Sequence, residues 1–208
     1  MERELAPQFA SVEQEARAWQ FGMWVFLSTE VLFFGGLFIA YGVYRFAYPQ
    51  DFHLASSHMN VWLGTANTLV LLTSSLFVAL ALHLVRHERS MWATLALVLA
   101  LLLGVVFMVF KGLEYAEHAR EGLLPGVYFA SHKLHSVGAL QFVTLYWLMT
   151  GLHALHVTIG LFVLAWTAFQ AASGFYSPRR MAGLEIGGMY WHFVDVIWVF
   201  LYPLLYLV

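Results

Sequence analysis

Five apolar runs, each long enough to cross a lipid bilayer as a helix, dominate this chain of 208 residues. A hydrocarbon layer about 30 Å thick requires roughly 20 apolar residues in a helix. Proline, glycine and charged residues mark the connections between the runs. The runs cover Phe21–Tyr44, Val61–Val85, Met91–Phe110 with a polar continuation to Tyr115, Phe142–Phe169 and Gly187–Val208. We therefore predict five transmembrane helices.

The composition is that of an all-α integral membrane protein. Hydrophobic residues make up 61% of the chain and charged residues 11%, with a mean hydropathy of +0.72, unlike ordinary soluble domains. The apolar runs are continuous and do not alternate as barrel strands would. We expect one bundle over residues 21–208, preceded by a cytoplasmic N-terminal segment of residues 1–20.

Charge and cysteine content exclude several kinds of site. A net charge of −2 without long runs of like charge argues against nucleic-acid binding. The sequence has no cysteine, so it can form neither a disulfide nor a thiolate metal centre.

Lysine and arginine are distributed unevenly between the two ends of the predicted bundle. The end with more of them usually faces the cytoplasm. The sets are Arg3, Arg17, Arg86, Arg89, Arg179 and Arg180 at the N-terminal end, against Arg45, Lys111, Arg120 and Lys133 at the other. We therefore predict a cytoplasmic N-terminus and a periplasmic C-terminus.

Glu30 lies inside the first apolar run. A charged side chain at membrane depth costs roughly 2.5–3.5 kcal/mol on insertion scales, and it usually faces the bundle interior and has a partner. Glu30 could handle protons or contact a lipid headgroup, or it could be a structural carboxyl bonded to a histidine of another helix. In either case we expect it to form a hydrogen bond with another span.

Other ionisable residues lie in the later runs. Lys111 and Glu114 are three residues apart, so we expect an ion pair near the interface, where a lysine side chain can extend towards water. His153 and His156 share a helix face, which favours hydrogen-bonded helix packing. A metal or haem ligand is the alternative, but a metal would need further ligands from other helices, such as His192, Glu30 or Asp195.

His192 and Asp195 are three residues apart in the last run, so they could pair with each other or point together at a partner helix. The predicted membrane-embedded polar network comprises Glu30, Glu114, His153, His156, His192 and Asp195.

Taken in order, these segments resemble subunit III of the haem-copper terminal oxidases over nearly the whole chain beyond residue 20. The resemblance rests on residues 28–34, Asn67-Thr68, Glu114-Tyr115, residues 150–160 and residues 190–198. It implies an accessory subunit with no catalytic residue, haem, copper or other metal of its own. Its expected partners in a bacterial inner membrane are subunit I, which reduces oxygen and pumps protons, subunit II, other small membrane subunits and lipids.

The resemblance also implies roles for individual residues. Glu30 falls at the family's membrane-embedded carboxylate, and the family supports subunit I stability and proton uptake. It also binds phospholipid in a cleft between its helices. Longer members have seven spans, so this chain is similar to five-span bacterial forms and lacks one wall of that cleft. The candidate lipid or interface contacts are Asn67, Tyr115, Trp191 and Trp198.

Two other interpretations remain open. The chain could be an accessory subunit of a nitric oxide reductase, which the neighbouring genes would reveal. It could instead be a small b-type cytochrome anchor, in which His153 or His156 and His192 ligate a haem. Replacing His192 would then abolish a haem absorbance band.

Overall fold

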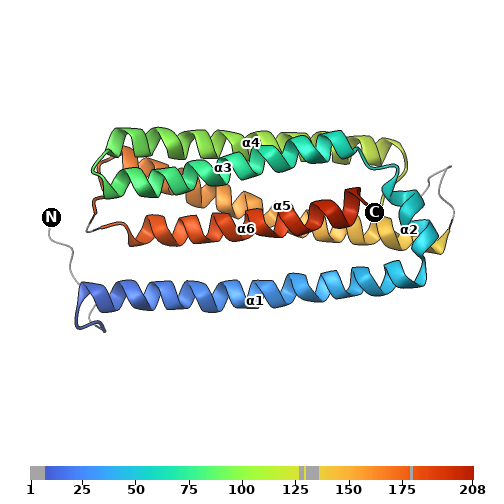
Figure 1. Ribbon diagram of the computed structural model, residues 1–208, viewed down its shortest axis with the longest axis horizontal. Helices are drawn as coiled ribbons and strands as arrows, with labels where there is room; N and C mark the ends of the chain where they lie inside the picture. The colour runs from blue at the N-terminus through green and yellow to red at the C-terminus, as the bar shows by residue number, and fades with distance from the viewer. Residues whose placement is uncertain (1–7, 127–128, 130–135, 179) are drawn as a thin grey trace.

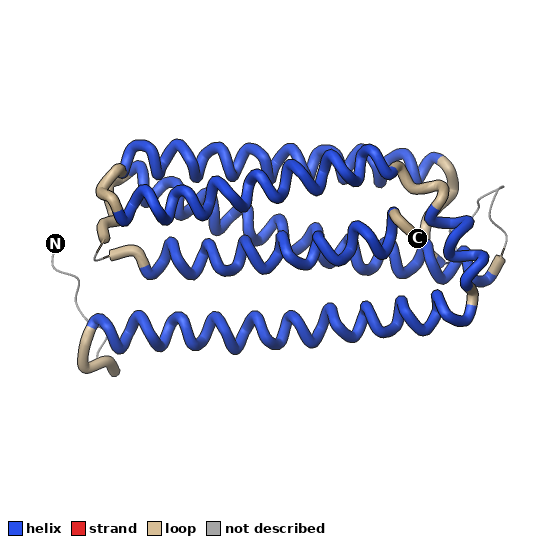
Figure 2. Tube along the Cα trace, in the orientation of Figure 1, coloured by secondary structure: helices blue, strands red, loops and turns tan. Residues whose placement is uncertain are grey.

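The computed structural model describes residues 8–126, 129, 136–178 and 180–208, which form a helical bundle (Figures 1 and 2). Five helices are long and apolar enough to span a membrane, which confirms the predicted fold class and number of spans. They are α1 (Val12–Ala47), α3 (Val61–Arg86), α4 (Ser90–Arg120), α5 (Val137–Ala172) and α6 (Ala182–Tyr206).

Several helices extend beyond the apolar runs that predicted them. α1 begins at Val12, well before Phe21, because the Ser11 side chain caps it by accepting a hydrogen bond from the Gln14 amide at 3.1 Å. The predicted N-terminal segment, residues 1–20, therefore contains the first turns of α1. Residues 1–7 of that segment lie outside the described residues.

A short helix that the sequence analysis treated as a connection, α2 (Pro49–Ser56), lies between α1 and α3. Proline suits a first helical turn because the amide hydrogen it lacks would have no partner there. At the other long connection, α4 continues to Arg120 and α5 begins at Val137, so the loop is shorter than the gap between the predicted runs, which end at Tyr115 and begin again at Phe142.

Helices α3, α4, α5 and α6 pack closely, whereas α1 lies at one edge and contacts α5 and α6 (Figure 1). α1 begins at one end of the bundle and α6 finishes at the opposite end. Which end faces the cytoplasm stays a prediction. Of the basic residues used for it, Arg3, Lys133 and Arg179 lie outside the described residues.

Two glycines allow helices to close around Trp191 of α6, which is 1% exposed. A Cβ atom on Gly104 of α4 would lie 2.8 Å from the Trp191 ring, and one on Gly160 of α5 would lie 2.7 Å from it. Such distances are too short for a side chain, so small residues at these positions let the three helices meet.

Candidate functional site

Glu30 of α1 and His156 of α5 join these helices near the middle of the bundle. His156 Nε2 lies 3.0 Å from Glu30 Oε2, and the two side chains are 13% and 19% exposed. His156 Nδ1 donates to the carbonyl oxygen of Leu152 at 2.8 Å, because a carbonyl can only accept. The remaining nitrogen therefore shares one proton with the Glu30 carboxyl group. The expected bond between Glu30 and another span is confirmed, and its partner is a histidine.

Lys111 and Glu114 of α4 form a closed hydrogen-bond cluster with two tyrosines. Lys111 Nζ donates to Glu114 Oε2 at 3.0 Å, to Tyr146 of α5 at 3.0 Å and to Tyr206 of α6 at 2.9 Å. Both tyrosine hydroxyls donate to Glu114 Oε1. All the lysine hydrogens and both carboxylate oxygens therefore have partners.

The predicted Lys111–Glu114 ion pair is confirmed, but the expectation that the lysine side chain extends towards water was wrong. The two side chains are only 2% and 1% exposed, so the lysine does not extend towards water. Four aromatic rings surround its ammonium group, with ring centroids 5.1–5.6 Å away. The tyrosine hydroxyls and the ring faces replace the water that the lysine would otherwise need.

His153 packs among aromatic rings and does not face the same neighbours as His156. It is stacked on Trp198 with ring centroids 5.1 Å apart, and Phe107 meets it edge-on at 5.8 Å. It is 1% exposed, and neither ring nitrogen has a hydrogen-bond partner in the described part of the chain. His156 contacts α1, whereas His153 contacts α4 and α6.

His192 and Asp195 of α6 meet through a serine on α3. His192 Nδ1 lies 2.5 Å from Ser75 Oγ, and Asp195 also interacts with Ser75. Asp195 is 5% exposed, and its Oδ1 has no hydrogen-bond partner among the described residues. Of the two predicted arrangements, the shared partner helix is the one observed.

The six residues of the predicted polar network therefore lie at four separate places in the bundle: Glu30 with His156, Glu114, His153, and His192 with Asp195. Within the described ranges, no group of three or more histidine, aspartate or glutamate side chains is arranged to hold a metal ion. The contacts also do not fit haem ligation. Both ring nitrogens of His156 are engaged and aromatic rings cover His153, so neither histidine is placed to pair with His192 as an axial ligand.

Three of the four candidate lipid or interface residues are enclosed by the chain's own helices. Asn67 and Trp198 are 0% exposed and Trp191 is 1% exposed, so that prediction is wrong for them. Their bulk fills the space between α3, α4, α5 and α6. Tyr115 is partly buried, and its hydroxyl donates to Thr150 at 2.6 Å.

Sequence reasoning missed Tyr146 and Tyr206, although a buried tyrosine hydroxyl usually requires a partner. It also missed Glu185 at the start of α6. This carboxylate accepts hydrogen bonds from Gln20 of α1 at 3.2 Å and from Arg86 of α3 at 3.1 Å. It therefore ties α1 and α3 to α6 at one end of the bundle.

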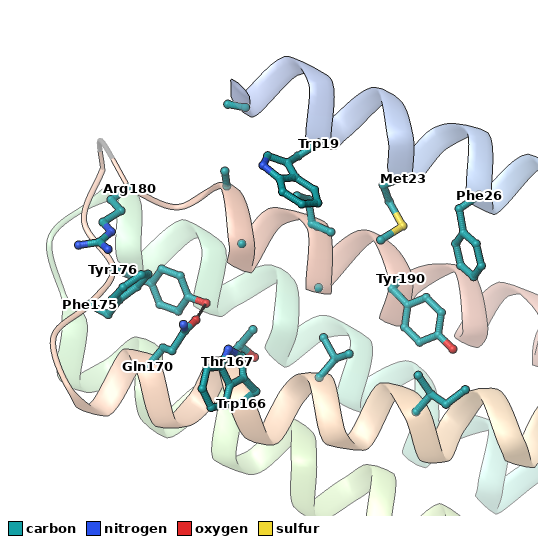
Figure 3. Close-up of a pocket in the computed structure, with 17 residues that line it drawn as sticks. Trp19, Met23, Phe26, Trp166, Thr167, Gln170, Phe175, Tyr176, Arg180 and Tyr190 are labelled. Atoms are coloured by element: carbon teal, nitrogen blue, oxygen red, sulfur yellow. Dashed lines mark hydrogen bonds between the residues drawn. The ribbon is translucent and has the colours of Figure 1, made fainter. Parts of the chain in front are cut away.

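A cavity of about 740 Å³ lies between the start of α1, the end of α5 and the start of α6 (Figure 3). Its walls are mostly apolar. Trp19 and Met23 project from α1, Trp166 from α5 and Tyr190 from α6. An apolar cavity of this size suits a small molecule or part of a larger one.

The cavity has a polar end in the loop between α5 and α6. The Arg180 guanidinium lies 3.6 Å from the Phe175 ring centroid, and its Nε has no hydrogen-bond partner among the described residues. Tyr176 donates to Gln170 at 2.5 Å (Figure 3). Burial raises the pKa of Tyr176 to about 12, so it remains a neutral hydroxyl near pH 7. Of the described residues that line the cavity, Arg180 is the charged one.

Sequence comparisons place these features in a known family. The profile of the family described as cytochrome c oxidase subunit III matches residues 10–208. The chain is 33% identical to cytochrome c oxidase subunit 3 of Thermostichus vulcanus, over 89% of this chain and 85% of that protein. It is 27% identical to a probable quinol oxidase subunit 3 of Staphylococcus epidermidis, over 90% and 87%.

The sequence similarity extends to relatives that are longer than this chain. The chain is 30% identical to cytochrome c oxidase subunit 3 of Marchantia polymorpha, with 90% of this chain covering 67% of that protein. The family profile includes all five spanning helices. The chain therefore belongs to the cytochrome c oxidase subunit III family, whose members are membrane subunits of respiratory terminal oxidases.

Proposed function

We propose that this chain is an accessory subunit, without redox centres, of a proton-pumping haem-copper terminal oxidase. It binds subunit I, which holds the haems and copper that reduce oxygen, and it supports the stability and proton uptake of that subunit. Subunit II and other small membrane subunits complete the assembly in a bacterial inner membrane. The relatives named above are cytochrome c and quinol oxidase subunits, which favours an oxidase over a nitric oxide reductase.

One observation carries this proposal. The histidines at membrane depth take part in contacts between the chain's own helices, as in the Glu30–His156 bond and the stacking of His153 on Trp198. Side chains used in this way hold helices together, and they are poorly placed to ligate a prosthetic group.

The proposal is tested by purifying the oxidase with and without this chain. Without it, we expect unchanged haem absorbance per subunit I and a normal initial rate of oxygen reduction, followed by a faster decline during turnover. The isolated chain should show no Soret band. Loss of a haem band together with the chain would contradict the absence of redox centres, and an unchanged turnover lifetime would contradict the supporting role.

We also propose that the cavity of Figure 3 binds a phospholipid. Its apolar walls suit an acyl chain, and Arg180 suits a phosphate group because a guanidinium forms strong charge-assisted hydrogen bonds with phosphate. The cavity lies between helices that this chain possesses, so it does not require the two extra helices of longer relatives.

Replacing Arg180 with glutamine should lower the amount of phospholipid that copurifies with the oxidase by about one molecule per complex, because the phosphate loses its cation. Phosphorus analysis and mass spectrometry after extensive detergent washing would measure this. The matched control is Arg89→Gln, which removes an exposed arginine that does not line the cavity. An equal lipid content in the two variants would contradict the proposed site.

A further inference from the structure

His192 lies deep in the membrane-spanning part of the bundle. α6 runs from Ala182 to Tyr206, so at 1.5 Å per residue His192 is about 15 Å from one end and about 21 Å from the other. Its partner Ser75 is similarly central in α3. At this depth any surface that protein does not cover faces hydrocarbon.

Only one of the two His192 ring nitrogens has a hydrogen-bond partner among the described residues. Nδ1 bonds Ser75, whereas Nε2 forms no hydrogen bond with any described residue. Nε2 is not enclosed, in contrast to both nitrogens of His153, and the His192 side chain is partly exposed. Nε2 therefore reaches the outer surface of the bundle.

Hydrocarbon cannot satisfy this nitrogen. Whichever tautomer is present, Nε2 carries either a hydrogen or a lone pair, and either one needs a hydrogen-bonding partner. Ser75 fixes the ring from the inside and also interacts with Asp195. Turning the ring to bury Nε2 would break the contact with Ser75, so the polar atom stays at the surface.

The surface around Nε2 is otherwise apolar. α3 and α6 run side by side (Figure 1), and exposed side chains from both flank the histidine. Val196 is 50% exposed, Val199 is 42% exposed and Leu72 of α3 is 43% exposed. We call the surface formed by Leu72, His192, Val196 and Val199 the α3–α6 face. It combines an apolar surface with one polar atom at mid-depth.

We propose that the α3–α6 face docks a transmembrane helix of oxidase subunit I, and that a polar side chain of this helix forms a hydrogen bond with His192 Nε2. This inference rests on the proposed function and adds the contact surface. A second copy of the chain fits less well. In a symmetric contact, the two copies of His192 could bond only if their rings adopted opposite tautomers, which breaks the equivalence of the copies.

Crosslinking tests the position of the face. The chain has no cysteine, so a single Val196→Cys can carry a photoactivatable thiol reagent in the assembled oxidase. The control is Leu32→Cys on α1, which is 76% exposed on a different side of the bundle. We expect Val196→Cys to crosslink to subunit I and Leu32→Cys to react with lipid.

The possible outcomes distinguish failure of the α3–α6 face from failure of the proposed accessory-subunit function. A crosslink to subunit I from Leu32→Cys alone would overturn the α3–α6 face and leave the proposed function standing. A crosslink from Val196→Cys to a second copy of the chain would also overturn this inference. If the unmodified chain does not copurify with subunit I at all, the proposed function itself fails.

A pair of variants tests the hydrogen bond. In His192→Asn the amide replaces Nδ1 beside Ser75 but leaves nothing at the position of Nε2, whereas the longer side chain of His192→Gln reaches that position. We expect His192→Asn to lower the fraction of chain that remains with subunit I in detergent by about fivefold, and His192→Gln to change it less than about twofold. Circular dichroism would check that both variants fold. Equal retention of the two variants would overturn the proposed contact.

Discussion

Replacing Lys111 with methionine is expected to lower the free energy of unfolding by about 3–5 kcal/mol, because the Glu114 carboxylate would lose its cation in an apolar interior. The lysine is 2% exposed, and its ammonium group also supports the hydroxyls of Tyr146 and Tyr206. Thermal or denaturant unfolding of the chain in detergent, followed by circular dichroism, measures this effect.

The double variant Lys111→Met with Glu114→Gln is the control for this prediction. It removes both charges and leaves an amide that can still accept hydrogen bonds from the two tyrosines. We expect the double variant to be more stable than Lys111→Met alone, because the uncompensated charge causes most of the damage. If both variants unfold like the original chain, the cluster does not stabilise the bundle.

Replacing Glu30 with leucine should loosen α1 from the rest of the bundle at mid-depth, because His156 Nε2 would lose its partner. An unsatisfied polar group of this kind costs about 1–3 kcal/mol. α1 would still be held near its ends, where Gln20 bonds Glu185 and the Tyr41 hydroxyl donates to the Leu204 carbonyl oxygen. The expected result is therefore local loosening and not loss of the fold.

Thiol labelling measures this loosening. Leu27 lies on the buried side of α1 and is 6% exposed, so a cysteine placed there should react slowly with a membrane-permeant reagent. We expect faster labelling in the Glu30→Leu background and nearly unchanged labelling with Glu30→Gln, whose amide can donate to His156. Equal rates in all three backgrounds would show that the Glu30–His156 bond does not hold α1 in place.

Hydropathy was sufficient to predict the number of spans, because a bilayer imposes a minimum length on every apolar helix. The cost of burying a carboxyl group was also sufficient to predict that Glu30 bonds another helix, and a histidine partner was one of the two interpretations. The sequence did not reveal where α1 begins or that α2 is helical, since both depend on capping and turn geometry.

The burial of Lys111 was not predictable from its neighbours in the chain. Its tyrosine partners lie 35 and 95 residues further along, on two other helices. The same limit applies to Asn67, Trp191 and Trp198, because which side of a uniformly apolar helix faces inward is decided by packing against the others. Local patterns indicate which residues are costly to bury. They do not identify the residues on other helices that stabilise those buried groups by hydrogen bonding and packing.

The Lys111 cluster also has a consequence for biogenesis. Helices enter the membrane in the order of synthesis, and at about 5–20 residues per second the ribosome needs roughly 5–20 s to make the 95 residues that separate Lys111 from Tyr206. During that interval Lys111 and Glu114 of α4 lack the hydroxyl of Tyr206. The Lys111 cluster is therefore complete only when α6, the last helix to be made, supplies the Tyr206 hydroxyl.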